Sequence, residues 1–316
     1  MIHWDRRSFI RNSAMGAVAL SLLPSCMPKS SEELNKSTGP RFRISLAQWS
    51  LHKALQGGQL DNLDFAQKAH SFGIHAIEYV NAFFKDKARD AAYLAQMNKR
   101  SSDVGVKQLL IMIDGEGGLA EVNESLRKEA VSNHYKWVEA AKTLGCHSIR
   151  VNAFSSVHDR AGMHTAAVES LGNLATFAKP YNINVIVENH GGYSSDGSWL
   201  AAVMKEINMP NCGTLPDFGN FCIRREEGAQ WDKPCVEEYD RYKGIAEMMP
   251  YAKGVSAKSY DFDALGNETT IDFQRMLNIV KASEYRGYIG IEYEGSRLSE
   301  DEGIVATKKL LERLIA

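Results

Sequence analysis

The chain has 316 residues, of which 44% are hydrophobic and 24% are charged. This composition is typical of a globular protein, and the length allows one large domain or two smaller ones. The formal net charge is -2, and no basic run is present in the sequence. A nucleic-acid-binding function is therefore disfavoured, because binding to phosphate backbones requires clustered positive charge.

The first 25 residues have the pattern of an export signal. Arg6 and Arg7 form a twin-arginine pair, and an apolar stretch at 14–23 follows them. That stretch is too short to span a bilayer. The letters LPSC at 23–26 resemble a bacterial lipoprotein cleavage box, which makes Cys26 a candidate for lipidation, with simple cleavage as the alternative. We expect residues 26–42 to be a polar tether, and the mature protein to be periplasmic or anchored to a membrane only through a lipid on Cys26.

Four further cysteines follow the leader, namely Cys146, Cys212, Cys222 and Cys235. They form no CxxC pair, and their spacing is not that of a zinc site. A domain of this size needs no disulfide for stability. We therefore expect these residues to be mostly structural thiols.

From Arg43 onward, short apolar runs alternate with longer segments of helical periodicity. The segment at 123–144, which ends at Gly145, predicts a helix, and so does the segment from Asp301 to the C-terminus. In the first of these, the predicted buried face contains Leu126, Ala130, Val131, Tyr135, Val138 and Ala141. The eight apolar runs are predicted strands: RISLAQWSL, HAIEYV, VKQLLIMID, HSIRVNAF, NVIVENHGG, CGTLPDFGN, KGVSAKSY and YIGIEYEG.

Eight strand–helix units in about 270 residues, without a change in composition, predict an α/β fold. We expect one (β/α)8 TIM barrel over residues 43–316. A doubly wound sheet is the alternative, and the absence of GxGxxG after the first predicted strand counts against it. The segment FCIRREEGAQWDKPCVEE between Asn220 and Tyr239 is long for a βα loop, and we expect it to form a lid or flap over the barrel mouth.

Polar residues end each predicted strand, where a barrel of this kind has its site. Because strand side chains alternate, Glu188 lies on the same face as His190, and Glu292 on the same face as Glu294, but the sequence does not determine which face points inward. Several acids in one pocket require a cation among them, which predicts either Mg²⁺ or Mn²⁺ or positive side chains such as Lys258 and Arg150. The residues at the strand ends are Gln48, His52, Glu78, Asp114, Arg150, Asn152, Glu188, His190, Asp217, Ser256, Lys258, Glu292 and Glu294.

The stretches VIVENHGG, LPDFGN, VSAKSYDF and GYIGIEYEG resemble the xylose isomerase-like barrel superfamily of sugar isomerases and epimerases. The resemblance covers the chain from about Arg43 to the end. It implies a divalent metal held by a Glu, an Asp, a His and a Glu at the ends of the fifth to eighth strands. By position, Glu188, Asp217 and Glu292 correspond to three of these ligands.

The sequence departs from the family pattern at two positions. Asn220 stands where the family has a His after the sixth strand, and Ser256 stands where the family has the metal-binding His of the seventh strand, while Lys258 of that motif is retained. No histidine follows His190 in the sequence. His190 could supply the missing imidazole ligand, or it could serve as a hydrogen-bonded residue that shapes the glycine turn.

The resemblance also implies a mechanism and a set of candidate binding residues. Glu188 and Glu292 would remove and return a proton next to a sugar carbonyl, and Lys258 would supplement or replace the metal as the electrophile. Aromatic residues near the mouth, Trp49 and Tyr260 first among them, offer flat apolar faces for a sugar ring. The candidate substrate-binding residues are His52, Glu78, Asn152, His190, Trp49 and Tyr260.

Three functions are consistent with these residues. The first is an exported isomerase or epimerase acting on a carbohydrate. The second is a keto-sugar or keto-glycoside lyase that uses the same proton abstraction, and the third is a sugar-binding barrel without activity. A DNA-repair nuclease is disfavoured, because the chain lacks the histidines and the basic surface that such an enzyme uses. The sequence does not determine the oligomeric state.

Overall fold

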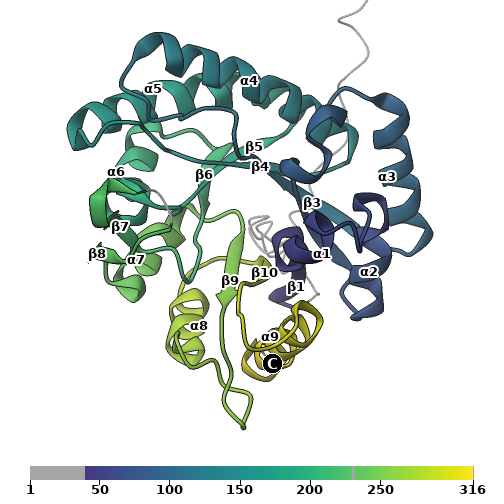
Figure 1. Cartoon of the computed structure of the whole chain (residues 1–316). Coiled ribbons are helices and arrows are strands. Elements are labelled where there is room, and N and C mark those ends of the chain that lie inside the picture. Colours follow the sequence, from purple (N-terminus) through teal and green to yellow (C-terminus); the bar gives the residue numbers. More distant parts are fainter. Residues whose placement is uncertain (1–39, 230–231, 316) are drawn as a thin grey trace, which may run out of the picture. The chain divides into compact units, whose positions relative to one another are not determined.

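Eight parallel strands run through the centre of the protein, and helices surround them (Figure 1). The computed structural model describes residues 40–229 and 232–315. The predicted leader, Cys26 and most of the predicted tether lie outside these residues. Each of the eight predicted apolar runs overlaps one barrel strand, which confirms the (β/α)8 fold. The strands are β1 (Phe42–Ala47), β2 (Ala76–Val80), β3 (Lys107–Met112), β4 (Ser148–Val151), β5 (Asn184–Glu188), β6 (Cys212–Leu215), β9 (Val255–Ser259) and β10 (Gly287–Tyr293).

The strands follow the order β6-β5-β4-β3-β2-β1-β10-β9, so the first barrel strand pairs with the last. Between β6 and β9 the barrel is closed by isolated bridges rather than by a continuous ladder. One bridge joins Thr214 to Ala252, and the other joins Asp217 to Ser256. The seam between β6 and β9 therefore has less backbone pairing than the other strand pairs.

The helices form the outer layer of the barrel (Figure 1). Helix α4 (Glu124–Thr143) begins after Asn123, whose side chain accepts a hydrogen bond from the Leu126 amide, and this agrees with the predicted boundaries. None of the helices in the described ranges is long and apolar enough to cross a membrane. The other helices are α1 (His52–Gln56), α2 (Phe65–Ser71), α3 (Ala91–Asp103), α5 (Arg160–Ala178), α6 (Gly197–Ile207), α7 (Arg241–Met248), α8 (Phe273–Ala282) and α9 (Glu300–Ile315).

The predicted buried face of α4 is wrong at Leu126, whose side chain is 52% exposed. Arg127 is buried there instead, and its guanidinium donates to the Glu121 carbonyl and pairs with Glu169. The first turn of α4 is therefore held by polar contacts, and the apolar face begins at Ala130.

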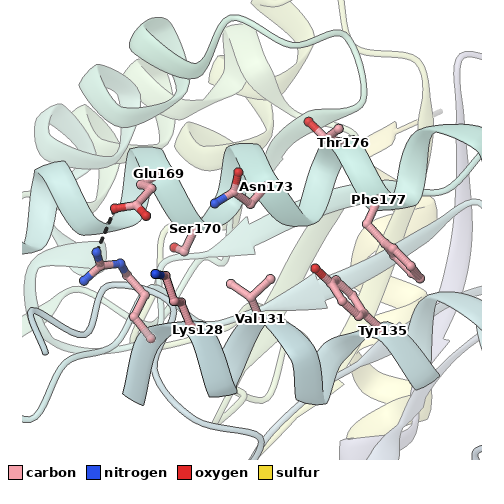
Figure 2. Close-up of a pocket in the computed structure, with 9 residues that line it drawn as sticks. Lys128, Val131, Tyr135, Glu169, Ser170, Asn173, Thr176 and Phe177 are labelled. Carbon is pink, nitrogen blue, oxygen red and sulfur yellow. Dashed lines mark hydrogen bonds and ion pairs between the residues drawn. The ribbon is translucent and has the colours of Figure 1, made fainter. Parts of the chain in front are cut away.

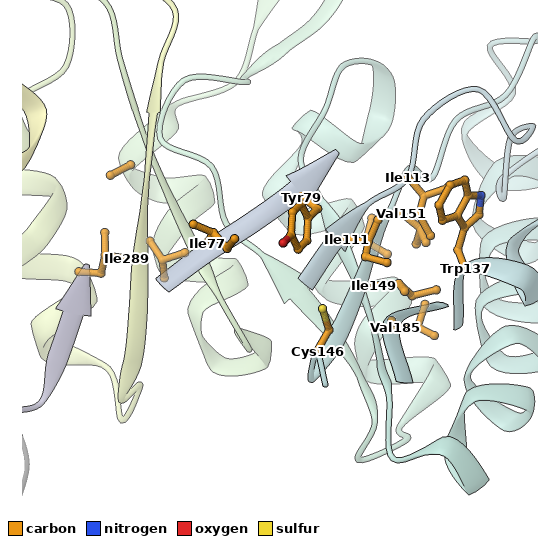
Figure 3. Close-up of a cluster of buried hydrophobic side chains, with 14 of the residues drawn as sticks. Ile77, Tyr79, Ile111, Ile113, Trp137, Cys146, Ile149, Val151, Val185 and Ile289 are labelled. Atoms are coloured by element: carbon orange, nitrogen blue, oxygen red, sulfur yellow. The ribbon is translucent and has the colours of Figure 1, made fainter. Parts of the chain in front are cut away.

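Alternation along the strands separates two apolar cores. Outward-pointing residues such as Ile77, Tyr79 and Ile111 pack against the helices (Figure 3). The inward-pointing residues form a smaller cluster inside the barrel, made of Ala47, Val80, Leu110, Met112, Ile186 and Leu215. This register resolves the ambiguity of the sequence, because Glu188 follows Ile186 by two residues and so points to the inside.

The insertion after β6 is a small antiparallel hairpin of β7 (Cys222–Arg225) and β8 (Cys235–Glu238). A disulfide joins Cys222 to Cys235, so the expectation of structural thiols is wrong for these two residues. Cys146 and Cys212 are buried free thiols, as expected. The hairpin strand β7 contacts the short 3-10 helix η5 (Gly192–Ser195) that follows β5, which places the hairpin beside the strand ends.

Candidate functional site

Three carboxylates from different barrel strands meet at the carboxyl ends of those strands. Glu188 ends β5, Asp217 follows β6, and Glu292 lies on β10. One oxygen atom from each lies within 4.8 Å of the others, and all three residues are at most 3% exposed. The structure thus gathers the three residues that the sequence predicted as metal ligands. Burial raises the pKa of Glu188 well above 4.5, although Arg150 acts in the opposite direction.

Ser256, which stands where the family has a histidine, lies between two of these acids. Its hydroxyl oxygen is 2.6 Å from Asp217 Oδ2 and 2.8 Å from Glu292 Oε2. A serine hydroxyl has one proton and can donate to only one carboxylate at a time. Holding the second carboxylate this close requires another proton or a cation. Burial raises the pKa of Asp217 to about 6, with Lys258 lowering it and Glu292 raising it further.

Asn220, the other departure from the family pattern, also contacts the cluster. Its side-chain amide donates to Glu188 Oε1 over 3.0 Å, and its backbone amide donates to Asp217 Oδ1 over 2.8 Å. Asn189 joins the same loops, because its side chain accepts from the Asp217 amide and donates to the carbonyls of Asp217 and Asn220. The sequence analysis missed Asn189, although its place between Glu188 and His190 in ENH was the available signal.

Arg150 on β4 is the nearest positive group to Glu188. Its Nε lies 2.7 Å from Glu188 Oε2, and its NH1 lies 2.7 Å from Asp114 Oδ1. Neither Arg150 Nε nor Glu188 Oε2 makes a well-aligned hydrogen bond, so this buried carboxylate oxygen keeps an unused acceptor direction. Burial alone would raise the pKa of Asp114, but Arg150 lowers it to about 2.

Lys258 on β9 lies between two glutamates of β10. Its Nζ is 3.5 Å from Glu292 Oε1 and 3.3 Å from Glu294 Oε1, and its side chain is 2% exposed. Burial opposes the charge, but Glu292, Asp217 and Glu294 together raise the pKa of Lys258 well above 10.5. Lys258 is therefore a fixed ammonium beside Glu292.

His190 is not brought into the carboxylate cluster. Within residues 40–229 and 232–315, the group of possible ligand atoms is Glu188, Asp217 and Glu292 alone. Burial and Arg150 lower the pKa of His190 to about 3, so its imidazole is neutral. Its backbone amide donates to Ser194 Oγ at the start of the glycine turn.

The remaining predicted substrate-binding residues lie at different depths. Trp49 stacks on His52 with ring centroids 4.9 Å apart, and it packs against the apolar cluster inside the barrel. Asn152 donates to Asp114 Oδ1 over 2.7 Å. Tyr260 lies over Gly219, where an added Cβ would come within 2.5 Å of the tyrosine oxygen. Trp49 follows β1, Asn152 follows β4 and Tyr260 follows β9, so all three lie in segments at the carboxyl ends of barrel strands.

Glu78 lies one layer deeper than the other predicted residues. It is 2% exposed, and it accepts a hydrogen bond of 2.6 Å from Ser45 inside the barrel. A Cβ on Gly290 would come within 2.7 Å of its carboxylate, and Gly290 precedes Glu292 by two residues on β10. Burial raises the pKa of Glu78 to about 7. This depth does not suit direct contact with a substrate at the mouth.

A groove between α4 and α5 lies in the outer helical layer and contains none of these site residues (Figure 2). Its walls include the stacked rings of Tyr135 and Phe177 and the ion pair between Arg127 and Glu169. These contacts join α4 to α5, so the groove is the boundary between two packed helices.

The carboxylate donors fit a divalent cation. They are all hard oxygen ligands, as Mg²⁺ and Mn²⁺ prefer, and one of the buried oxygens keeps an unused acceptor direction. A family model described as "Xylose isomerase-like TIM barrel" matches residues 66–314. The chain belongs to the xylose isomerase-like TIM barrel family. Among curated protein sequences, no match was found.

Several solved structures share this fold. A 3-keto-D-glucoside 4-epimerase from E. coli has a TM-score of 0.62 at 13% identity, over 87% of this chain and 100% of that one. A D-psicose 3-epimerase from Clostridium cellulolyticum H10, solved with D-tagatose, has a TM-score of 0.65 at 11% identity, over 86% and 99%. A family protein from Mycobacterium smegmatis, solved with magnesium, has a TM-score of 0.61 at 14% identity, over 86% and 96%. At these identities the likeness shows the shared fold.

Proposed function

We propose that this family member is an exported sugar isomerase or epimerase that moves a proton next to a carbonyl between Glu188 and Glu292. The observation that carries the proposal is the meeting of these two glutamates with Asp217 at the strand ends, beside the buried cations Arg150 and Lys258. The sugar epimerases among its structural neighbours support the substrate class.

The proposed reaction begins at a carbon next to a sugar carbonyl. One glutamate carboxylate takes the proton, and the electron pair of the C–H bond forms the C=C bond of an enediolate. The other glutamate returns a proton. Return to the opposite face of the same carbon gives an epimer. Return to the former carbonyl carbon gives the aldose–ketose isomer, provided that the hydroxyl proton of the neighbouring carbon moves to the former carbonyl oxygen as the new C=O bond forms. Lys258, fixed within 3.5 Å of Glu292, is placed to stabilise the negative oxygen.

A divalent metal belongs to the proposal as a resident cofactor. Glu188, Asp217 and Glu292 would hold it, and Ser256 would orient two of these carboxylates by its hydrogen bonds. When bound, such a metal polarises a carbonyl and lowers the cost of negative charge on its oxygen. Replacement of the family histidine by Ser256 leaves an all-oxygen donor set, which favours Mg²⁺ or Mn²⁺ over zinc.

Export is supported by two independent features. The twin-arginine pattern of the leader is one of them. The other is the disulfide between Cys222 and Cys235, because the cytosol keeps most thiols reduced. We therefore place the mature protein in the periplasm or on a membrane through a lipid on Cys26.

Deuterium exchange tests the proposed chemistry. The mature protein with Mn²⁺ is incubated in D₂O with ketoses, aldoses and 3-keto-glucosides, and loss of the proton next to the carbonyl is followed by NMR. We expect Glu188→Gln and Glu292→Gln each to slow exchange by roughly 10²–10⁴-fold, the usual contribution of a positioned acid or base. Glu139→Gln, on the outer face of α4, is the matched control. Exchange that persists in both site variants would refute the proposal.

A keto-glycoside lyase is the second candidate, and Lys258 is the observation that favours it. A buried ammonium beside Glu292 could protonate the oxygen that leaves after the same proton abstraction. The C–O bond to the aglycone would break as the enolate electrons form a conjugated C=C bond. Release of the aglycone from a 3-keto-glucoside, without a stable epimer, would identify this reaction.

A further inference from the structure

A pocket of about 140 Å³ opens between the β7–β8 hairpin and the loops that follow β4 and β5. We call it the hairpin pocket. Its walls include Phe154 and Ser156 after β4, His190 and Gly191 after β5, and Ile223 and Ala229 of the hairpin. None of these residues belongs to the carboxylate cluster, so the hairpin pocket is a separate space beside it.

The hairpin pocket is next to the proposed reaction centre. His190, which lines it, follows Glu188 by two residues, at the point where β5 ends. The β4 wall begins at Ala153, three residues after Arg150, which contacts Glu188. A ligand that covers the carboxylates could therefore extend over His190 into the hairpin pocket.

The size and chemistry of the pocket fit one sugar ring. A closed cavity of about 150 Å³ can hold a benzene ring; the hairpin pocket has a similar volume of about 140 Å³ but is open on one side, so a pyranose ring would fill it and extend out of it. Phe154, which is 39% exposed, offers an apolar face for the C–H side of such a ring. The Ser156 hydroxyl and the imidazole of His190 are polar groups of the kind that orient sugar hydroxyls.

The base of the hairpin is held by a covalent bond and by hydrogen bonds between described residues. The disulfide between Cys222 and Cys235 closes the hairpin, and the Tyr239 amide donates to the Phe221 carbonyl at its base. On the side toward β5, Ser195 Oγ donates to the Asn220 carbonyl over 2.8 Å. Binding against a preformed wall avoids the cost of ordering a loop.

We propose that the hairpin pocket is a second sugar subsite, and that the substrate is a two-unit carbohydrate. The reacting unit lies over Glu188 and Glu292, and the second unit fills the hairpin pocket. This rests on the proposed function for the position of the reacting unit. Because a glycosidic carbon has no carbonyl, the reacting unit is either the reducing end of a disaccharide or a ring oxidised to a keto-glycoside.

Binding measurements test the subsite without turnover. The Glu292→Gln protein is titrated by calorimetry with D-glucose and D-fructose as one-unit probes, and with cellobiose, maltose and a 3-keto-disaccharide as two-unit probes. We expect at least one disaccharide to bind tenfold or more tightly than either monosaccharide. Ile223→Trp, which fills the pocket, should reduce that ratio to about one, and Phe154→Ala should reduce it severalfold. Val236→Trp is the matched control, since Val236 is on the hairpin, is 46% exposed and does not line the pocket.

Three results would overturn the subsite. They are equal affinity for one-unit and two-unit sugars, absence of binding by every probe, and the same loss of the ratio in Val236→Trp as in Ile223→Trp. The two proposals fail in different experiments. Absence of deuterium exchange on every sugar would refute the catalytic proposal, while the ratio of binding constants would still decide the subsite.

Discussion

Replacing Arg150 with Met tests the electrostatic account of the site most directly. Arg150 is 3% exposed, and its guanidinium lies 2.7 Å from both Glu188 and Asp114. Removing one partner of a buried ion pair leaves the other charge uncompensated, which costs about 3–5 kcal/mol. The unfolding entropy of a barrel of about 275 residues is roughly 0.6 kcal/mol per degree. We therefore expect Tm to fall by about 5–9 °C.

The pH dependence of this loss gives the reasoning its second test. Burial already raises the pKa of Glu188 in the folded protein, and loss of Arg150 raises it further. A carboxyl whose folded-state pKa is raised favours folding when protonated, and this contribution disappears as pH rises through the folded-state pKa. Arg150 also holds the pKa of Asp114 at about 2, and the loss of that contact persists at pH 4.5, so the deficit of the variant should be present at pH 4.5 and grow further toward pH 8.

Thermal and urea unfolding between pH 4.5 and pH 8, with chelator present, measure both effects. The chelator is needed because a divalent cation would replace part of the missing charge. Arg89→Met is the matched control, since Arg89 and Glu139 form an exposed pair at 3.9 Å that contributes 0–1 kcal/mol at most. A deficit below 1 kcal/mol at pH 8, or one that does not change with pH, would refute the reasoning.

Four further predictions follow from the site and the hairpin. Glu78→Gln should stabilise the protein by about 2–3 kcal/mol more at pH 8 than at pH 5, because the wild-type carboxyl has a pKa of about 7 and its contribution to folding is lost as pH rises. The same difference in unfolding free energy between the two proteins at both pH values, measured with urea, would contradict this. Mn²⁺ at 100 times its Kd should add about 2.7 kcal/mol of stability, reversibly with EDTA, and Asp217→Asn should abolish the gain; a gain that survives in the variant places the ion elsewhere. Ser256→His should increase affinity for Zn²⁺, measured by competition with a chelating dye, and an unchanged affinity would mean that the imidazole does not reach the cluster. Replacing Cys222 and Cys235 by Ser should cost about 3 kcal/mol of local hairpin stability and speed proteolysis at 222–235 while the barrel Tm changes little; a large fall in Tm would show that the hairpin supports the barrel.

The sequence predicts the barrel well because its strands are buried on both faces and separated by clear helical segments. The same apolar runs carry Glu188, Asp217 and Glu292 at their ends, so the candidate ligands could be named before their geometry was known. The inward direction could not be predicted, because a strand of alternating residues has two faces and only the closed barrel selects one.

Other features depend on contacts between distant segments. Arg150 was expected only as a general positive charge, and its direct approach to Glu188 results from the register of β4 against β5. The disulfide was missed because the size of the whole domain was taken as the guide, whereas Cys222 and Cys235 stabilise a hairpin that stands outside the barrel sheet. Leu126 was placed in the core by periodicity, but the helix end extends beyond the apolar layer.

Because β6 and β9 are joined by few backbone hydrogen bonds, side-chain contacts within the site help to hold these two strands together. Asp217 and Ser256 are bridged through their backbones at this seam, and their side chains meet there as well. An ion bound by Asp217, after β6, and by Glu292, on β10, would link the two sides of the barrel wall at this seam. Binding of the ion would then slow hydrogen exchange of the backbone amides at the ends of both strands. Removal of the ion would let these strand ends open more often. The carboxylates proposed for catalysis would in that way also hold the barrel closed between β6 and β9.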